Sequence, residues 1–374
     1  MMYLDNASTT KPYPQVIDAI FQNLSTHFAN PSSSHTLGRS AATCLEDARK
    51  TLLNALGEKG KVYFTSGGTE ANNWAIKAAL HKNRHLGKHI IATAIEHDSV
   101  LALLKQLETQ GYELSFLQPD AQGNISLSQL ETTLRPDTAL VVSMLVNNET
   151  GGILPVGDMV KLVRKQSKAL FFTDAIQAFC KIPFCPTELG VDFLSVSGHK
   201  IHGPRGVAAL WVQDKVSITP LLYGGGQESG LRSGTESLHN IVGFTKAVEL
   251  AKASFAHTSA HLLDLQQYFR EHLMVALPTA KLLPQGAPHI VNFSLPGYKS
   301  EVLMNFLDAK GIYLSHASAC KKGGRSHVLS AMGLAPKIID GSLRVSFSYE
   351  TTILELDTLI KALVTAQKTL FQSL

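Results

Sequence analysis

This chain of 374 residues has few cysteines, a small net charge and no long hydrophobic run. The four cysteines, Cys44, Cys180, Cys185 and Cys320, are too few and too scattered for a disulfide framework or a zinc site. The 34 basic and 30 acidic residues leave a net charge of +4, too weak to indicate direct nucleic-acid binding. No apolar run approaches the roughly 20 residues of a membrane helix, so we expect no membrane partner.

Residues 1–6 have neither the basic nor the apolar stretch of a signal peptide, which favours a cytoplasmic location. The composition, 44% hydrophobic and 17% charged, is that of an ordinary folded protein. At 374 residues the chain suits two domains better than one small core. It contains no internal repeat and no low-complexity linker.

Strand-like and helical segments alternate along the first part of the chain, which predicts a doubly wound α/β domain. The strand-like segments are residues 61–65, 88–93, 140–146, 169–173 and 193–196. We expect residues 207–212 to form an antiparallel edge strand. The helical segments between the strands are residues 70–80, 99–110 and 156–166. Because the strands are continuously apolar, we expect both faces of the sheet to be covered.

A long helical stretch at residues 238–274 separates this part from the rest of the chain. The elements predicted beyond it are strands near 289–294 and 342–348 and helices near 300–310 and 353–371. We interpret this region as a second, smaller α/β domain. The predicted division is a large domain of residues 12–255 and a small domain of residues 1–11 and 256–374.

One lysine has an unusual place in the predicted sheet. Lys200 follows the strand 193–196, after Ser197 and His199, and precedes a turn stiffened by glycine and proline. An ordinary solvated lysine is the alternative interpretation. At a buried strand end, however, the pKa of an amine falls and the amine can attack a carbonyl group. Pyridoxal 5'-phosphate is the cofactor that most often uses such a lysine, and it also needs a phosphate cradle and a carboxylate partner.

Two other strand ends carry groups of these kinds. Gly68 and Thr69 lie between a strand and a helix, whose first amides can bind a phosphate; a plain helix N-cap is the alternative. No Gly-Lys-Ser/Thr follows, so this is not a Walker loop. Asp174 ends the apolar run 170–173, where a carboxylate needs a cation or a donor. It can pair with a protonated ring nitrogen or, alternatively, cap a helix.

His97 and Asn148 follow two further strands. His97 can stack on a flat ring, and Asn148 can donate to a ring hydroxyl or, alternatively, form a turn. Metal binding at residues 96–98 is disfavoured because neighbouring residues of a strand point apart. Ligands of open α/β sheets bind beyond the carboxyl ends of the strands. The residues that we therefore expect at one edge are Thr69, His97, Asn148, Asp174 and Lys200.

With these motifs the chain resembles the cysteine desulfurases, which are class V members of the fold-type I pyridoxal-phosphate enzymes. The resembling segments are residues 3–10, 30–33, 65–73, 96–97, 146–151, 174–177, 197–204, 224–228, 232–236, 318–320 and 343–346. The resemblance covers nearly the whole chain. It implies a fold-type I α/β fold with a large, mostly parallel-sheet domain and a smaller α/β C-terminal domain. It also implies pyridoxal 5'-phosphate as the cofactor and no metal.

The resemblance implies roles for the residues around the ring of the cofactor. Lys200 would bind the cofactor covalently, and Asp174 would pair with its pyridine nitrogen. His97 would stack on the ring, and Asn148 and Gln177 would bond its hydroxyl side.

The phosphate and the substrate have their own implied partners. The residues that would hold the phosphate are Gly68, Thr69, Ser197 and His199. Thr235 would reach the phosphate from the other subunit, so a homodimer is implied. Arg344, with Asn30, would bind the carboxylate of L-cysteine, because a planar guanidinium suits this anion.

Cys320 decides between the alternative chemistries. Its segment, 318–324, is polar and glycine-rich, which favours a mobile loop over a buried structural cysteine, and the adjacent lysines favour the thiolate. In a desulfurase this thiolate would take the sulfur of cysteine as a persulfide and leave alanine. The catalytic residues would be Lys200, Cys320 and His97, and a sulfur-acceptor or scaffold protein would use the sulfur for iron–sulfur clusters or tRNA thiolation.

Two other functions are open to such a chain. A selenocysteine lyase, or another class V aminotransferase or lyase, would keep Lys200 and Asp174 but need no thiol at position 320. A catalytically idle scaffold would keep the fold alone, and the presence of both Lys200 and Cys320 argues against it. The sequence therefore predicts a pyridoxal-phosphate-dependent cysteine desulfurase.

Overall fold

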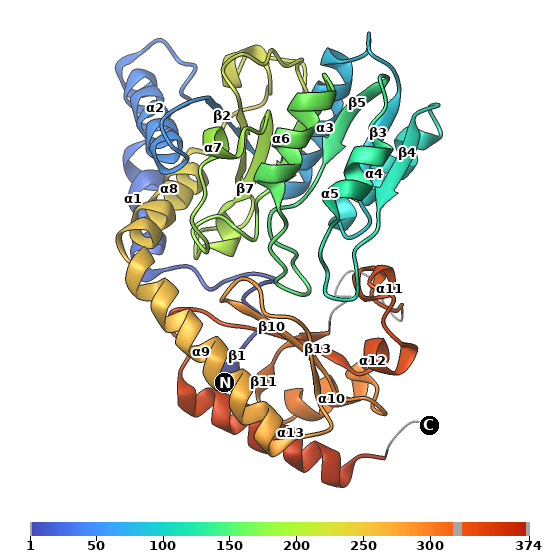
Figure 1. The fold of residues 1–374 in the computed structure, drawn as a ribbon. Helices are drawn as coiled ribbons and strands as arrows, with labels where there is room; N and C mark the ends of the chain where they lie inside the picture. Colours follow the sequence, from blue (N-terminus) through green and yellow to red (C-terminus); the bar gives the residue numbers. More distant parts are fainter. Residues whose placement is uncertain (1, 317–323, 372–374) are drawn as a thin grey trace.

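The computed structural model describes residues 2–316 and 324–371. Figure 1 shows a large α/β unit above a smaller one, with a long helical run along one side of both. That run consists of α8 (Leu238–Ala253) and α9 (Phe255–Ala276), which meet at Ser254. Within the described residues, no helix is both long enough and apolar enough to cross a membrane.

The sheet of the large unit has, across the described residues, seven strands in the order β2-β8-β7-β6-β5-β3-β4. They are β2 (Lys61–Thr65), β3 (His89–Thr93), β4 (Glu113–Leu117), β5 (Thr138–Val142), β6 (Leu170–Asp174), β7 (Phe193–Ser197) and β8 (Ala208–Val212). Only β8 pairs antiparallel with its neighbours among these strands, and the remaining pairs are parallel. The predicted large, mostly parallel sheet is confirmed.

The prediction that residues 207–212 form an edge strand is wrong. β8 is antiparallel, as expected, but it lies between β2 and β7 and pairs with both along its whole length. The connection of residues 198–207 after β7 brings β8 back beside that strand. The distant strand β2 then covers the other side of β8, and a pairing between segments so far apart in the chain leaves no local pattern in the sequence.

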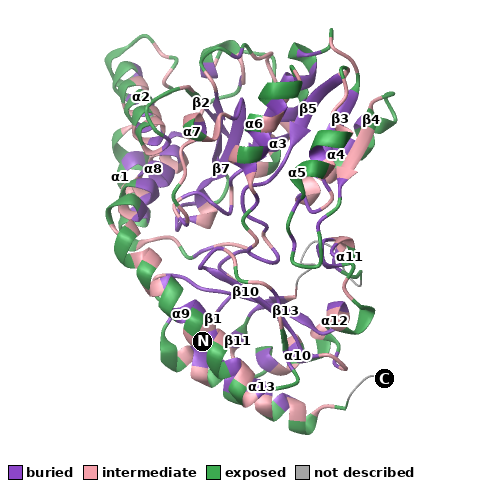
Figure 2. Ribbon diagram, viewed as in Figure 1, coloured by how far each residue is buried: buried purple, intermediate pink, exposed green. Residues whose placement is uncertain are grey.

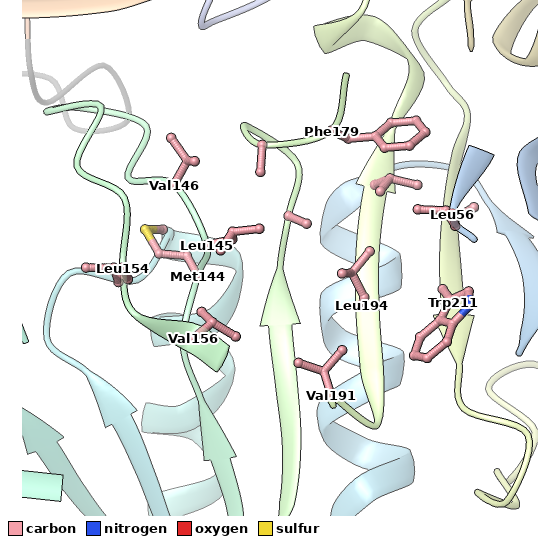
Figure 3. Close-up of a cluster of buried hydrophobic side chains, with 14 of the residues drawn as sticks. Leu56, Met144, Leu145, Val146, Leu154, Val156, Phe179, Val191, Leu194 and Trp211 are labelled. Carbon is pink, nitrogen blue, oxygen red and sulfur yellow. The ribbon is translucent and has the colours of Figure 1, made fainter. Parts of the chain in front are cut away.

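Both faces of the large sheet are covered, as the apolar strands predicted. Successive side chains of a strand point to opposite faces, so Leu194 of β7 belongs to one core and Phe193 to the other. Figure 2 shows most strands of the large sheet as buried and the edge strand β4 as intermediate. Figure 3 shows part of the first core with Leu194 and Trp211.

Helices of the large unit supply the other half of each core. One face is covered by α3 (Gly68–Lys82) and α4 (Asp98–Glu108). The helices that contribute to the opposite core are α1 (Pro14–Thr26), α2 (Thr36–Ala55), α5 (Leu127–Thr133), α6 (Val156–Gln166) and α8. The short helix α7 (Pro186–Leu189) precedes β7. Helices such as α2 and α6 bury one apolar stripe and leave a polar stripe in solvent, whereas α3 is buried on most of its surface.

The smaller unit has a third core of its own, which includes Phe269, Phe293 and Leu363. Its strands are β9 (Lys281–Leu282), β10 (Ile290–Ser294), β12 (Ser315–His316) and β13 (Ser342–Ser346) in one sheet, and β1 (Met2–Tyr3) with β11 (Ile312–Tyr313) in another. Its helices are α9, α10 (Ser300–Asp308), α11 (His327–Ala331), α12 (Pro336–Asp340) and α13 (Ile353–Thr369). The second, smaller α/β unit is thus present, while its boundaries as a domain stay a prediction.

Candidate active site

A cavity of about 380 Å³ lies beyond the carboxyl ends of the parallel strands. The predicted site residues that line it are Gly68, Thr69, His97, Asn148, Asp174, Gln177, His199, Lys200 and Arg344. The predicted meeting of five strand ends at one edge is confirmed, because parallel strands bring their carboxyl ends to the same side of a sheet. A hollow of about 470 Å³ lined by Tyr3, Lys11 and Arg205 contains none of the predicted site residues.

Lys200 projects from a tight turn directly after β7. Residues Gly198–Lys200 form one 3-10 turn, and a Cβ atom on Gly198 would lie 3.1 Å from Phe244 and 3.2 Å from the carbonyl of Pro204. The close approach explains why glycine precedes the lysine here. The Nζ atom of Lys200 donates hydrogen bonds to the carbonyls of Ala7 (2.7 Å) and Ser8 (2.6 Å).

These two carbonyls belong to residues 5–10, which we call the N-terminal strap. Arg344 of β13 binds the strap through Asp5 Oδ1 (2.8 Å) and Ser8 Oγ (2.9 Å). Gln177 donates to the carbonyl of Ala7 (2.8 Å), the same oxygen that accepts from the lysine. The strap therefore connects groups of both units across the cavity. Sequence reasoning gave it no role beyond a family motif.

Arg344 is almost completely buried, with 2% of its surface exposed. Its Nη1 atom donates to the carbonyl of Asn148 (2.8 Å), and its Nη2 atom donates to Asp5. Its Nε atom has no hydrogen-bond partner among the described residues. The guanidinium is thus held from behind and retains a donor, which is the arrangement that an anionic substrate group requires.

Asp174 ends β6 and is 6% exposed. Its Oδ1 atom accepts from the amide of Ile176 (2.9 Å) and its Oδ2 atom from Asn72 Nδ2 (2.7 Å). These donors stabilise the charged carboxylate in a buried place. His97 caps α4, where its Nδ1 atom accepts from the amide of Ser99 (3.1 Å). Asp174 does not cap a helix, which the sequence left open as an alternative, because a turn follows it; His97 does cap one, and both side chains line the cavity.

The residues predicted to hold a phosphate include a helix start and a buried hydroxyl. Gly68 and Thr69 form the first turn of α3, whose amides point free N–H groups outward. Ser197 is 1% exposed, and its Oγ atom has no partner among the described residues, which is unusual for a buried hydroxyl. Burial and the charges of Lys200 and Arg205 lower the pKa of His199 to about 4, so its imidazole is neutral at neutral pH.

Three of the predicted site residues that the structure describes do not line the cavity: Ser197, Asn30 and Thr235. Asn30 is exposed, and its Oδ1 atom accepts from the amide of Ser32 (2.8 Å), so the structure does not bring it to Arg344. Thr235 is exposed and also absent from the lining of this chain's own cavity. Cys320 lies outside the described residues.

Two buried carboxyl groups that the sequence reasoning missed lie behind the cavity. Burial and the charge of Asp174 raise the pKa of Glu96 to about 8, although Thr93 and the amide of Met144 donate to it. Burial likewise raises the pKa of Glu149 to about 8, and Ser326 donates to this carboxyl. Both groups are neutral acids in the lower part of the physiological range. Within residues 2–316 and 324–371, no group of three or more His, Cys, Asp or Glu side chains is placed to hold a metal ion.

Comparison with known proteins agrees with this architecture. The family model of the class-V aminotransferases matches residues 2–359. A cysteine desulfurase IscS of Methanosarcina thermophila is 40% identical over 366 residues, which cover 96% of this chain and 90% of that one. A solved NifS-like protein has a TM-score of 0.93 at 34% identity and covers 99% of this chain and 100% of its own.

A solved structure of SspA in complex with cysteine has a TM-score of 0.79 at 31% identity and covers 94% of this chain and 100% of its own. The fold and the family match confirm the predicted fold-type I class of pyridoxal-phosphate enzymes. The chain belongs to the class-V aminotransferase family and, within it, to the cysteine desulfurases.

Proposed function

We propose that this protein is a pyridoxal-phosphate-dependent cysteine desulfurase, which converts L-cysteine to L-alanine and transfers the sulfur to Cys320. The observation that carries the proposal is the cavity, which holds Lys200, Asp174, His97 and Arg344 together in a chain of this family. The proposal applies to this chain the activity in the names of its relatives.

The residues around the cavity fit the cofactor. The unpaired, buried hydroxyl of Ser197 at the end of β7 suits a phosphate, together with Gly68 and Thr69 at the start of α3 and with His199. In the same cavity, the carboxylate of Asp174 suits a protonated ring nitrogen. When bound, the cofactor supplies an electron sink for the substrate's α-carbon.

The remaining contacts of the ring follow from the same lining. Lys200 would bind the aldehyde carbon covalently, after leaving the carbonyls of Ala7 and Ser8. His97 would lie against the ring, and Asn148 and Gln177 would bond its hydroxyl side.

Arg344 would bind the carboxylate of L-cysteine, with its guanidinium held by the strap and with Nε as a remaining donor. Asn30 would join it only after a movement from its exposed position. The cysteine complex of SspA supports a substrate of this class for a chain of this fold.

The sulfur transfer balances without an added oxidant. The thiolate of Cys320 attacks the substrate sulfur, an S–S bond forms, and the C–S bond of the substrate breaks. The carbon that loses sulfur gains a proton, so L-cysteine and a thiol become L-alanine and a persulfide. Lys200 and His97 are the groups placed to move protons in the cavity.

The wider context is part of the same proposal. We expect a homodimer in which Thr235 reaches the partner's phosphate, and domains of residues 12–255 and of 1–11 with 256–374. The persulfide would pass to an acceptor or scaffold protein for iron–sulfur clusters or tRNA thiolation. A cytoplasmic location stays a prediction from the sequence.

Replacement of the thiol tests the activity directly. Cys320→Ala should abolish sulfide release from L-cysteine, since the acceptor of the sulfur is gone, while the absorbance of the bound cofactor stays. Mass spectrometry of the wild-type protein after cysteine treatment should find one added sulfur atom on Cys320. Cys185→Ala is the control and should release sulfide normally. Full activity of Cys320→Ala would contradict the proposal and favour a selenocysteine lyase or another class V reaction.

A further inference from the structure

A continuous chain of hydrogen bonds connects Asp174 to His97 through Asn72 and Ser99. We propose that Asn72 and Ser99 are positioning residues. They hold the Asp174 carboxylate in place and, in the uncharged form of the His97 imidazole, fix the proton on Nε2. The inference rests on the proposed function, because it assigns the carboxylate and the imidazole to one cofactor site. Neither positioning residue was given a role from the sequence.

Asn72 is completely buried in α3, and its amide has one possible orientation. Its Nδ2 atom donates to Asp174 Oδ2 (2.7 Å) and to Ser99 Oγ (2.9 Å), so both N–H bonds are used. The flipped amide would place its oxygen against the carboxylate, and two acceptors repel each other. The Nδ2 atom must therefore face Asp174.

The oxygen atom of the same amide is energetically unfavourable where it lies. Asn72 Oδ1 is buried and has no hydrogen-bond partner among the described residues. An apolar side chain of similar shape would avoid this unpaired acceptor. A buried asparagine that uses both donors and leaves its acceptor unpaired is explained by what it donates to, not by a contribution to packing.

Ser99 passes the orientation on to His97. Because the Ser99 Oγ atom accepts from Asn72, its own hydrogen is available for His97 Nδ1 at 2.8 Å. The backbone amide of Ser99 donates to the same Nδ1 atom at 3.1 Å. A ring nitrogen that accepts two donors carries no proton, so the neutral imidazole has its proton on Nε2.

The consequence concerns groups from three separate elements. Asp174 ends β6, His97 precedes α4, and Asn72 lies on α3. Asp174 and His97 both line the cavity, whereas Asn72 does not. One side chain behind the cavity wall thus sets the position of the carboxylate and, through Ser99, makes His97 Nε2 a hydrogen-bond donor.

The tautomer of His97 is measurable without cofactor or turnover. In the ¹⁵N-histidine-labelled apoprotein, wild-type His97 should show an unprotonated Nδ1 and a protonated Nε2. Ser99→Ala removes one of the two donors to Nδ1 and keeps the backbone amide, so both resonances should move part of the way toward the average of two exchanging tautomers. Ser99→Thr, which keeps the hydroxyl, should restore them. A wild-type His97 protonated on Nδ1, or unchanged resonances in Ser99→Ala, would overturn the proposal.

His89 offers a matched control in the same sheet. Its Nε2 atom contacts Ser115 Oγ at 2.9 Å, and neither residue lines the cavity. Ser115→Ala should change the resonances of His89 and leave those of His97 unchanged. If it altered His97, the effect of Ser99→Ala would be a general response of the sheet.

The contact between Asn72 and the Asp174 carboxylate is tested by a second measurement. Asn72→Leu fills a similar volume but donates nothing, so the pH at which the absorbance of added pyridoxal 5'-phosphate changes should shift relative to the wild type. With L-cysteine, Ser99→Ala should lower kcat about tenfold with little change in KM, less than the loss of a general acid itself. An unchanged absorbance titration in folded Asn72→Leu would contradict the role of Asn72.

These outcomes separate the two proposals. If the wild type releases no sulfide from L-cysteine, the proposed function fails, and the NMR result still decides the tautomer. If the wild type is active but the variants behave like it in every readout, only the positioning role fails.

Discussion

At the scale of single residues, the pKa of a buried carboxyl group depends on the few donors and charges next to it. Asp174 and Glu96 are both buried carboxyl groups near one sheet edge. Asp174 has N–H donors on both of its oxygens, whereas the Oε2 atom of Glu96 has no partner among the described residues and its pKa is raised to about 8. Each carboxyl group accepts two hydrogen bonds, but both donors of Glu96 reach Oε1, so its buried Oε2 atom stays unpaired and burial raises its pKa.

The raised pKa of Glu149 predicts a pH dependence of stability. Its ordinary pKa is 4.5 and its folded value is about 8, so the folded state retains a proton that the unfolded state loses between these values. Its contribution is therefore fully present below pH 4.5 and is lost as the pH rises to 8, at about 1.4 kcal/mol per unit of pKa.

Glu149→Gln removes this titration and should flatten the decline of Tm between pH 4.5 and 8. Thermal unfolding of the apoprotein across this range measures the slope. Glu113→Gln is the control, because Glu113 is exposed. Identical slopes in wild type and Glu149→Gln would rule out a neutral Glu149 in the folded protein.

At the scale of elements, the N-terminal strap joins the two units at the cavity. It follows β1, which pairs with β11 in the small unit, and its carbonyls meet Lys200 at the edge of the large sheet. The strap is irregular in structure, so its position depends on hydrogen bonds such as that between Asp5 and Arg344. Catalytic groups are commonly held by such loops on a rigid scaffold.

Asp5→Asn should weaken the hydrogen bond that holds the Arg344 guanidinium in place. The loss of a charge-assisted hydrogen bond should destabilise the protein by about 1–3 kcal/mol and raise KM for L-cysteine several-fold, since the guanidinium is no longer held in place. Steady-state kinetics and chemical unfolding measure both effects.

Glu350→Gln is the matched control for Asp5→Asn. It removes an ion pair of the same chain end, between Lys11 and Glu350 at 3.6 Å, which is exposed on both sides and contributes little. Asp5→Asn with wild-type KM would show that the strap does not orient Arg344.

At the scale of the whole molecule, the cavity of one chain lacks one residue that we propose for the phosphate site. Thr235 is exposed and does not line the cavity of its own chain, although the family resemblance gives it a phosphate contact. A second copy would resolve this difference by placing its Thr235 at the phosphate end.

Complementation between two inactive variants tests the shared site. Lys200→Ala and Thr235→Val should each bind pyridoxal 5'-phosphate poorly as homodimers. If Thr235 acts across the interface, a heterodimer of the two variants regains one intact site with wild-type affinity, because the intact Lys200 and the intact Thr235 meet in the same cavity. Titration of tagged, purified heterodimers by absorbance measures this. A heterodimer without such a site would mean that Thr235 acts within its own chain or not at all.

Local sequence patterns were sufficient for much of the fold. The helix predicted at 156–166 agrees with α6, and the strand at 61–65 agrees with β2, because periodicity reports burial directly. The strand predicted at 140–146 extends beyond β5, which ends at Val142, since the following residues stay apolar and buried after leaving the regular ladder. β4 was missed because an edge strand is only partly buried, and its pattern is weak.

The sequence by itself determined that strand ends carrying Thr69, His97, Asn148, Asp174 and Lys200 meet at one edge, since chain direction in a parallel sheet requires it. Tertiary structure alone decided that β8 lies inside the sheet, that the strap holds Arg344, and that Asn72 connects Asp174 to Ser99. These features depend on contacts between residues far apart in the chain. A hydrogen bond of that kind depends on distance and direction in space, which no local pattern of residues records.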